Sequence, residues 1–288
     1  MQLGAGLAAK QRNNAAHGTS RGTATEDEGA PPGRKKPAMK IDWLEQREAE
    51  VPYENCWMSR NELDRLAAMR VPKRRADWRL GRWTAKLAIA SFLHFRLDLP
   101  ALADIEIRAA SSGAPEAFLH NEPAPVSISL SHSSATALCA IAALGGKFGC
   151  DLETIEPRDD AFIADYFTTE EKSIVDRSSI EDRPLLVALL WSAKESALKA
   201  LRVGLRLPTT SVSVQFSEGY PPPGQRPRSP VRSGAEEWSA LSVRYSADQM
   251  FTGYWRAEGN LVRTVVCDAP QFTLRQSPFV ETLLTTPF

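Results

Sequence analysis

Two acidic side chains stand two residues apart in the segment 149–153, Gly-Cys-Asp-Leu-Glu. Successive side chains of an extended strand alternate between two faces, so Asp151 and Glu153 share one face while Cys150 and Leu152 face a core. Neighbouring carboxylates repel each other and need a compensating cation. Mg²⁺ typically takes one or two carboxylates together with phosphate oxygens and water, so the pattern fits a magnesium site. A strand face with two solvated acids is the alternative.

A third acid, Glu195, lies in the segment 191–199, Trp-Ser-Ala-Lys-Glu-Ser-Ala-Leu-Lys. At 3.6 residues per turn, Glu195 and Lys199 lie one turn apart, on the side of a helix away from its apolar stripe. One interpretation is a solvent-exposed i,i+4 pair. The other makes Glu195 a third metal ligand and Lys199 a phosphate contact. Trp191 and Leu198 flank this face, which indicates that something covers it.

Basic side chains recur at spacings of four, three and four in Arg75, Arg79, Arg82 and Lys86. On one helix they form a narrow stripe, and guanidinium groups match phosphate oxygens well. Contact with a nucleic-acid backbone and plain solvation of the helix are the alternatives. His132, flanked by serines after a predicted strand, is placed either to donate to phosphate or to serve structurally.

A scaffold of both helices and strands must position these residues. Helical periodicity covers 60–70, 75–97 and 185–201, and a capping box predicts a helix over 169–177. Strands are predicted at 105–109, 126–130, 135–144, 148–153, 212–216, 240–245, 250–255 and 261–267. Strands and helices alternate twice, so we predict an α+β fold of two similar α/β lobes that meet near residue 146.

Composition divides the chain into three segments. Residues 1–38 are rich in Gly, Ala, Thr and charge, and we expect a disordered tail. Residues 39–145 are the predicted N-terminal lobe and residues 146–288 the C-terminal lobe. Within the latter, 219–234 is dense in Pro, Gly, Ser and Arg, which predicts a mobile loop.

Charge and cysteine usage exclude several classes of protein. The formal net charge is zero, so no whole-molecule field favours nucleic acid or an anionic membrane. The four cysteines are widely spaced, which argues against a zinc or disulfide framework and fits a reducing compartment. No apolar run reaches the length of a membrane span, and the first ten residues are too weakly apolar for a signal peptide. We expect a cytoplasmic protein that binds neither nucleic acid nor membrane.

The order of the motifs resembles that of the 4'-phosphopantetheinyl transferase superfamily, in its monomeric two-lobed class that activates peptide, polyketide and siderophore synthases. That family has a Gly-x-Pro turn, a strand into Ser-His-Ser, Gly-[Val/Ile]-Asp-x-Glu and Trp-x-x-Lys-Glu-[Ser/Ala]-x-x-Lys. Here these stand at 113–115, 129–133, 149–153 and 191–199. The basic segment 74–86 and the segment 166–171 also resemble the family. Two positions depart from it: Cys150 replaces an aliphatic residue, and Val203 replaces the lysine of a common Lys-Gly-Leu.

The resemblance implies transfer of the 4'-phosphopantetheine arm of coenzyme A to a serine of an acyl or peptidyl carrier protein, with release of 3',5'-ADP. It implies Mg²⁺ held against the coenzyme A pyrophosphate by three acids, Asp151, Glu153 and Glu195. Lys199 would reach the pyrophosphate, and Glu195 would take the serine proton. The phosphates of the coenzyme A nucleotide would be bound by Arg75, Arg82, Ser131 and His132. Its adenine would be bordered by Gly113 and Pro115.

Two other functions stand beside this prediction. A metal-dependent phosphodiesterase or nuclease could use the same acids, but it would need more ligands than three carboxylates. A non-enzymatic nucleic-acid-binding module could be built on the basic helix and the tail, in which case the acids would be incidental.

Overall fold

The structure is a computed structural model that describes residues 38–95, 98–203, 207–216, 238–246 and 249–277. The predicted loop 219–234 and, apart from Ala38, the predicted tail lie outside these residues. The described part is a mixed α+β fold, as the sequence predicts, and it has five α-helices and three sheets. None of its helices combines the length and apolar character needed to cross a bilayer.

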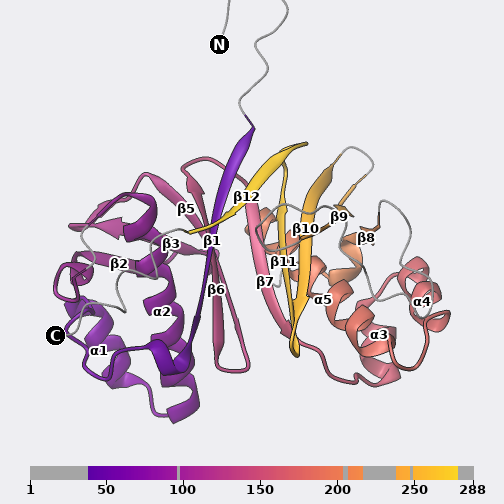
Figure 1. The fold of residues 1–288 in the computed structure, drawn as a ribbon, viewed down its shortest axis with the longest axis horizontal. Helices are drawn as coiled ribbons and strands as arrows, with labels where there is room; N and C mark the ends of the chain where they lie inside the picture. Colours follow the sequence, from indigo (N-terminus) through magenta and orange to yellow (C-terminus); the bar gives the residue numbers. More distant parts are fainter. Residues whose placement is uncertain (1–37, 96–97, 204–206, 217–237, 247–248, 278–288) are drawn as a thin grey trace, which may run out of the picture. The chain divides into compact units, whose positions relative to one another are not determined.

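The first sheet joins strands from both ends of the described chain. Its order is β12-β1-β6-β5, and its strands are β1 (Met39–Arg47), β5 (Val126–Ser133), β6 (Thr136–Ala143) and β12 (Phe272–Gln276). β12 pairs in parallel with β1, whereas the other neighbours are antiparallel. Two helices, α1 (Arg60–Ala68) and α2 (Pro72–Phe92), lie on this side of the molecule (Figure 1). Between α2 and β5 the chain forms a small sheet of β2 (Ile105–Ala109), β3 (Pro115–Leu119) and β4 (Glu122–Pro123).

The second sheet is built only from residues after 147. Its order is β7-β11-β10-β9-β8, with β7 (Phe148–Thr154), β8 (Ser213–Gln215), β9 (Ser239–Arg244), β10 (Met250–Glu258) and β11 (Leu261–Cys267). Its helices are α3 (Asp160–Tyr166), α4 (Thr169–Asp176) and α5 (Arg183–Leu201) (Figure 1). Short 3-10 helices occur at Glu48–Glu50, Ala101–Asp104 and Thr209–Ser211.

Three apolar clusters hold these layers together. One lies between the two sheets and contains Ile41 and Leu138 of the first sheet with Cys150 and Val265 of the second. The other two lie under the long helices, α2 on the first sheet and α5 on the second. Because β5 and β7 are edge strands of their sheets and lie side by side, polar groups of both strands meet at one line.

Most predicted elements are present, with shifted ends. β2 and β11 have the predicted bounds, while β5 extends to Ser133, so that the Ser-His-Ser motif belongs to the strand. α2 ends at Phe92, before the predicted end at residue 97. β1, β3, β4 and β12 were not among the predicted strands, and α3 was not among the predicted helices.

A fully buried lysine anchors each long helix. In α2, the Lys86 ammonium lies 2.6 Å from the Glu62 carboxylate and donates to the carbonyls of Trp57 and Leu102. The predicted phosphate-binding stripe is therefore wrong at Lys86, because this side chain has no exposed surface and is already paired. A helical repeat of basic residues does not reveal which of them points inward.

The same arrangement recurs in the second half of the chain. In α5, the Lys194 ammonium lies 2.7 Å from the Glu171 carboxylate and donates to the carbonyls of Thr209 and Val212. Each glutamate is also the last residue of a capping box, which Ser59 and Thr168 begin. Each further accepts a strand N–H, from Ile107 and Val214, respectively.

Candidate functional site

Serine side chains of β5 bind the two edge strands together. Ser129 Oγ accepts the backbone N–H of Cys150 at 3.0 Å. Two residues on, Ser131 Oγ donates to Asp151 Oδ1 at 2.7 Å. An edge strand presents backbone groups that need hydrogen-bond partners, and the Ser129 hydroxyl of the neighbouring sheet is one such partner. Asp151 is thereby held at the line where the two sheets meet.

Gly149 allows α5 to lie directly on β7. A Cβ at this position would collide with the carbonyl oxygen of Ser196 and lie 2.8 Å from the backbone nitrogen of Ala200. On the adjacent strand, the buried Thr264 hydroxyl bonds to the hydroxyls of Ser192 and Ser196. The glycine of the acidic motif thus brings the helix backbone close to the strand, which places the two motifs face to face.

One partly exposed stripe of α5 lies over the acidic face of β7. It consists of Trp191, Glu195 and Lys199, each one turn apart. Trp191 Nε1 donates to Glu153 Oε1 at 2.9 Å, and Lys199 Nζ donates to Asp151 Oδ1 at 2.7 Å. Of the two interpretations that the sequence left open, the solvent-exposed pair within the helix does not describe Lys199, because Lys199 bonds to the strand.

Two carboxylate oxygens of this cluster are buried without a hydrogen-bond partner, Asp151 Oδ2 and Glu195 Oε1. Burial, followed by the charge of Asp151, raises the pKa of Glu153 to about 7, and the same two causes raise the pKa of Glu195. Burial lowers the pKa of Lys199, but the neighbouring acids outweigh it and the net direction is upward. Buried polar atoms without partners are costly, so this site is built to receive positive charge.

The donor chemistry of the cluster fits a hard divalent cation. As the side chains stand, no group of three His, Cys, Asp or Glu among the described residues already has the spacing of a metal site. The two unpaired carboxylate oxygens, and three acids against the charges of Lys199 and the more distant Arg158, nevertheless match the oxygen ligands that Mg²⁺ takes. The residues able to hold such an ion are Asp151, Glu153 and Glu195.

The raised pKa of Glu153 predicts an unusual pH dependence of stability. Between pH 4.5 and about 7 the folded protein keeps a proton that the unfolded chain has released, so the free energy of unfolding should fall as pH rises through this window. The contribution is on the order of 3 kcal/mol for a shift of this size. Glu153→Gln should remove it, so that the variant is more stable than wild type at pH 8.

Urea unfolding in EDTA at pH 5 and pH 8 would measure this effect. Glu156→Gln, at an exposed position three residues along the chain, is the matched control and should keep the wild-type pH dependence. If the free energy of unfolding changed equally with pH in wild type and in Glu153→Gln, the predicted contribution of Glu153 would be contradicted.

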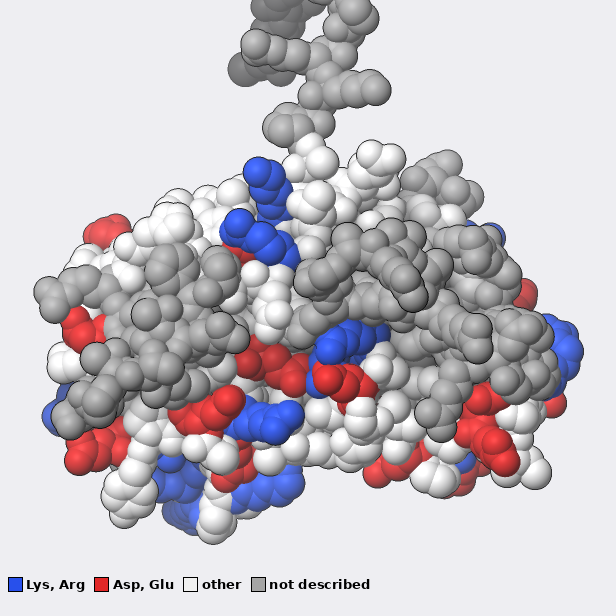
Figure 2. Space-filling model, in the orientation of Figure 1, with Lys and Arg blue, Asp and Glu red and all other residues white. Residues whose placement is uncertain are grey.

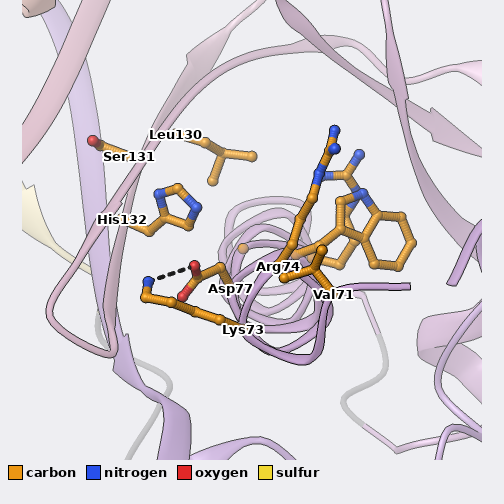
Figure 3. Close-up of a pocket in the computed structure, with 10 residues that line it drawn as sticks. Val71, Lys73, Arg74, Asp77, Leu130, Ser131 and His132 are labelled. Atoms are coloured by element: carbon orange, nitrogen blue, oxygen red, sulfur yellow. Dashed lines mark hydrogen bonds and ion pairs between the residues drawn. The ribbon is translucent and has the colours of Figure 1, made fainter. Parts of the chain in front are cut away.

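A pocket of about 410 Å³ opens between α2 and the end of β5. Figure 3 shows Leu130 and His132 on the strand side, facing Lys73, Arg74 and Asp77 of the helix. The pocket is lined by Val71, Lys73, Arg74, Asp77, Trp78, Gly81, Arg82, Leu130, Ser131 and His132. Three of its ten residues are cationic at neutral pH and one is acidic, so it favours an anionic ligand.

Two donors in this pocket are buried and have no hydrogen-bond partner, Arg82 Nε and Trp78 Nε1. The Arg82 guanidinium lies 4.5 Å from the Trp78 ring centroid. Burial lowers the pKa of Arg82 to about 10, which still leaves it charged at neutral pH. Lys73, by contrast, is paired with Asp77 at 2.9 Å. Arg82 and Arg74 thus offer guanidinium groups to an anionic ligand in this pocket.

The structure brings together some of the predicted nucleotide-binding residues. Arg82, Ser131 and His132 line the pocket. Arg75 does not line it, and its Nη1 donates to the Met69 carbonyl at 3.2 Å. Gly113 has a φ of 88° in the turn before β3, and Pro115 begins that strand; neither lines the pocket.

The predicted site residues include only Arg82, Ser131 and His132 of the ten lining residues; of the others, Lys73, Arg74 and Trp78 carry side-chain donors. The sequence shows the basic run that starts at Lys73, but nothing in it indicates which ligand or which element of the fold the run contacts. Ser131 is the residue that connects the two halves of the site, because it lines the pocket and also donates to Asp151. The acidic cluster and the basic pocket are therefore neighbours.

Comparison with known families identifies one segment of the chain. The family model of the 4'-phosphopantetheinyl transferase superfamily matches residues 147–239. The matched segment contains β7 and α5, and so all three acids and Lys199. The comparison confirms the resemblance over this segment, while the basic pocket lies outside it. No curated protein gives a significant sequence match to the chain.

Proposed function

Because residues 147–239 match the 4'-phosphopantetheinyl transferase superfamily, we propose that this protein moves the 4'-phosphopantetheine arm of coenzyme A to a serine of an acyl or peptidyl carrier protein. The proposed reaction is that of a holo-[acyl-carrier-protein] synthase, with 3',5'-ADP as the second product. One observation carries the proposal: Asp151 is bonded both to Lys199 of the second acidic motif and to Ser131, which also lines the basic pocket.

Coenzyme A supplies the anionic groups that the pocket lacks. Its nucleotide carries a phosphomonoester and a pyrophosphate, which suit Arg82 and Arg74 as fork-shaped donors and Lys73 as a point charge. His132, exposed at the strand end, adds a further donor. Because Ser131 lines the pocket and bonds to Asp151, a pyrophosphate bound beside Ser131 would lie near the acidic cluster.

Asp151, Glu153 and Glu195 would hold Mg²⁺. When bound, the ion supplies charge neutralisation and polarisation at the pyrophosphate oxygens. Lys199 adds a fixed positive charge, because its bond to Asp151 keeps its ammonium at the edge of the acidic cluster. Phosphoryl transfer depends mainly on positioning and on such electrostatic stabilisation.

Glu195 is the proposed general base. The carrier serine oxygen forms a bond to the β-phosphorus, the bond from that phosphorus to the oxygen of 3',5'-ADP breaks, and the serine proton passes to the Glu195 carboxylate. Burial and the charge of Asp151 raise the pKa of Glu195, which makes it a better proton acceptor than an ordinary glutamate. Its Oε1 atom is buried and has no hydrogen-bond partner among the described residues.

We also propose that residues 39–145 and 146–288 are similar lobes related by a pseudo-two-fold axis, with the site between them. The recurring ion pairs support this relation: Lys86 with Glu62 and Lys194 with Glu171 join equivalent elements in each half. β12 would then be a strand of the C-terminal segment that completes the N-terminal sheet. A cytoplasmic monomer remains part of the proposal.

The two alternatives receive no support from the family match. A metal-dependent nuclease would need more ligands than the three acids. On the face shown in Figure 2, lysine and arginine side chains are interspersed with acidic ones, and its described residues form no continuous basic surface. The charge pattern of this face therefore does not favour nucleic acid.

Incubation of the full chain with an apo-carrier protein, coenzyme A and Mg²⁺ tests the proposal. Intact mass spectrometry should show one added phosphopantetheine, and none in EDTA or on a carrier whose acceptor serine is alanine. Coenzyme A with Mg²⁺ should also raise the midpoint of thermal unfolding, since a ligand of the native state stabilises it. Failure to modify any carrier, including permissive peptidyl carriers, would contradict the proposal.

A further inference from the structure

An aromatic cluster borders the acidic site beside Glu153. The Trp191 ring of α5 packs against Phe162 and Tyr166 of α3, with ring centroids 5.1 Å away in both cases. Phe162 and Tyr166 are themselves 4.9 Å apart. Phe162 and Tyr166 hold the indole by edge-to-face contacts, which favour defined orientations.

The indole N–H of Trp191 points out of this cluster and donates to Glu153 Oε1 at 2.9 Å. On the other carboxylate oxygen, Oε2, Arg158 Nη2 is more distant, at 3.8 Å, and Arg158 also lies over the Phe162 ring. The Glu153 side chain thus has one short hydrogen bond, and its donor belongs to a ring whose own position is set by packing.

The type of donor is also informative. A neutral indole N–H can fix the rotation of a carboxylate without cancelling its charge, whereas a short lysine contact, such as that on Asp151, neutralises its partner in part. A neutral donor on Oε1 adds no positive charge to the carboxylate, and Oε2, which Arg158 approaches only to 3.8 Å, is left for a cation. Partners of this kind commonly set the orientation of metal-binding side chains.

We infer that Trp191 is a positioning residue, which orients the Glu153 carboxylate for binding a divalent cation. This inference rests on the proposed function in one respect, because it takes Glu153 as a metal ligand. A purely structural role for Trp191 would require only its ring, whereas positioning requires the N–H.

Trp191→Phe separates these roles, because it keeps an aromatic ring against Phe162 and removes the N–H. Binding of Mn²⁺ to the full chain, followed by the electron paramagnetic resonance signal of the free ion, should be weakened about 10–100-fold. In the transfer assay the KM for Mg²⁺ should rise similarly, while kcat at saturating Mg²⁺ stays near the wild-type value.

Trp83→Phe is the matched control. Trp83 Nε1 also donates a side-chain hydrogen bond, to Gln46 Oε1 at 3.2 Å, but within the core under α2. This variant should lose comparable stability and bind Mn²⁺ with wild-type affinity. Wild-type Mn²⁺ affinity in Trp191→Phe would overturn the inference.

The variant Glu153→Gln distinguishes a failure of this inference from a failure of the proposed function. If it weakens Mn²⁺ binding as Trp191→Phe does, but the wild-type protein modifies no carrier, the positioning role stands and the proposed function fails. If Glu153→Gln binds Mn²⁺ as wild type does, Glu153 is not a ligand and the inference fails, whatever the transferase assay shows.

Should Trp191→Phe not fold, the wild-type protein labelled with ¹⁵N-tryptophan replaces it. Of its seven indole N–H resonances, one should be shifted downfield by the carboxylate and should move in Glu153→Ala. Seven unchanged resonances would overturn the inference.

Discussion

Glu195→Gln is expected to lower kcat for phosphopantetheine transfer by about 10²–10⁴-fold, the usual contribution of a general base. The amide has nearly the same shape as the carboxylate, but it cannot take the serine proton and carries no charge for a cation. Initial rates from intact mass, measured at saturating coenzyme A and Mg²⁺, would give this value. The acidic limb of the wild-type pH–rate profile should also be lost from the residual activity.

The variant should remain folded, because it removes a carboxylate whose Oε1 atom is buried without a partner. Its free energy of unfolding at pH 8 should therefore be no lower than that of wild type. Glu181→Gln, at an exposed position before α5, is the matched control and should keep wild-type kcat. Wild-type turnover by Glu195→Gln would remove both roles assigned to this residue.

Lys194→Met is expected to lower the free energy of unfolding by about 3–5 kcal/mol, because it leaves the Glu171 charge buried and unpaired. Both partners are almost fully buried, so water cannot replace the lost ammonium. Two backbone carbonyls, of Thr209 and Val212, lose their donor at the same time. Urea unfolding at pH 7 would measure the loss.

The equivalent pair in the other half offers an internal control. Lys86→Met should cost a similar free energy, because Lys86 has the same buried ion pair and also donates to two carbonyls. Adding Glu171→Gln to Lys194→Met should recover part of the stability, since the amide oxygen can still accept the N–H of Val214 without a charge. A double variant no more stable than the single one would contradict this account of the loss.

Local patterns were sufficient to predict which side chains of the acidic motif and of the long helix face the core. Alternation along β7 predicts that Cys150 and Leu152 face inward, and both are almost fully buried, at 0% and 1% exposure. Helical periodicity likewise predicts that Leu186, Leu190 and Ala193 form a core face, and all three have no exposed surface. These features depend only on which way neighbouring side chains point, which the backbone geometry of one element determines.

Local patterns did not predict which residues the charged side chains contact. Lys86 and Arg82 lie on the same helical stripe, yet one is paired with Glu62 in the core and the other lines the pocket. Periodicity gives the direction of a side chain relative to its own helix, but not the element that covers it. Strands β1 and β12 were missed for a related reason: their pairing joins segments more than two hundred residues apart.

By itself, the sequence determined the α+β class, the shared face of Asp151 and Glu153, and the helix that bears Glu195 and Lys199. Only the tertiary structure decided that Lys199 bonds to Asp151, that Trp191 bonds to Glu153, and that a pocket with Lys73 and Arg74 lies next to the acids. The reason is physical: the direction of a side chain follows from the geometry of its own segment, whereas its contacts follow from how distant segments bury their apolar faces together.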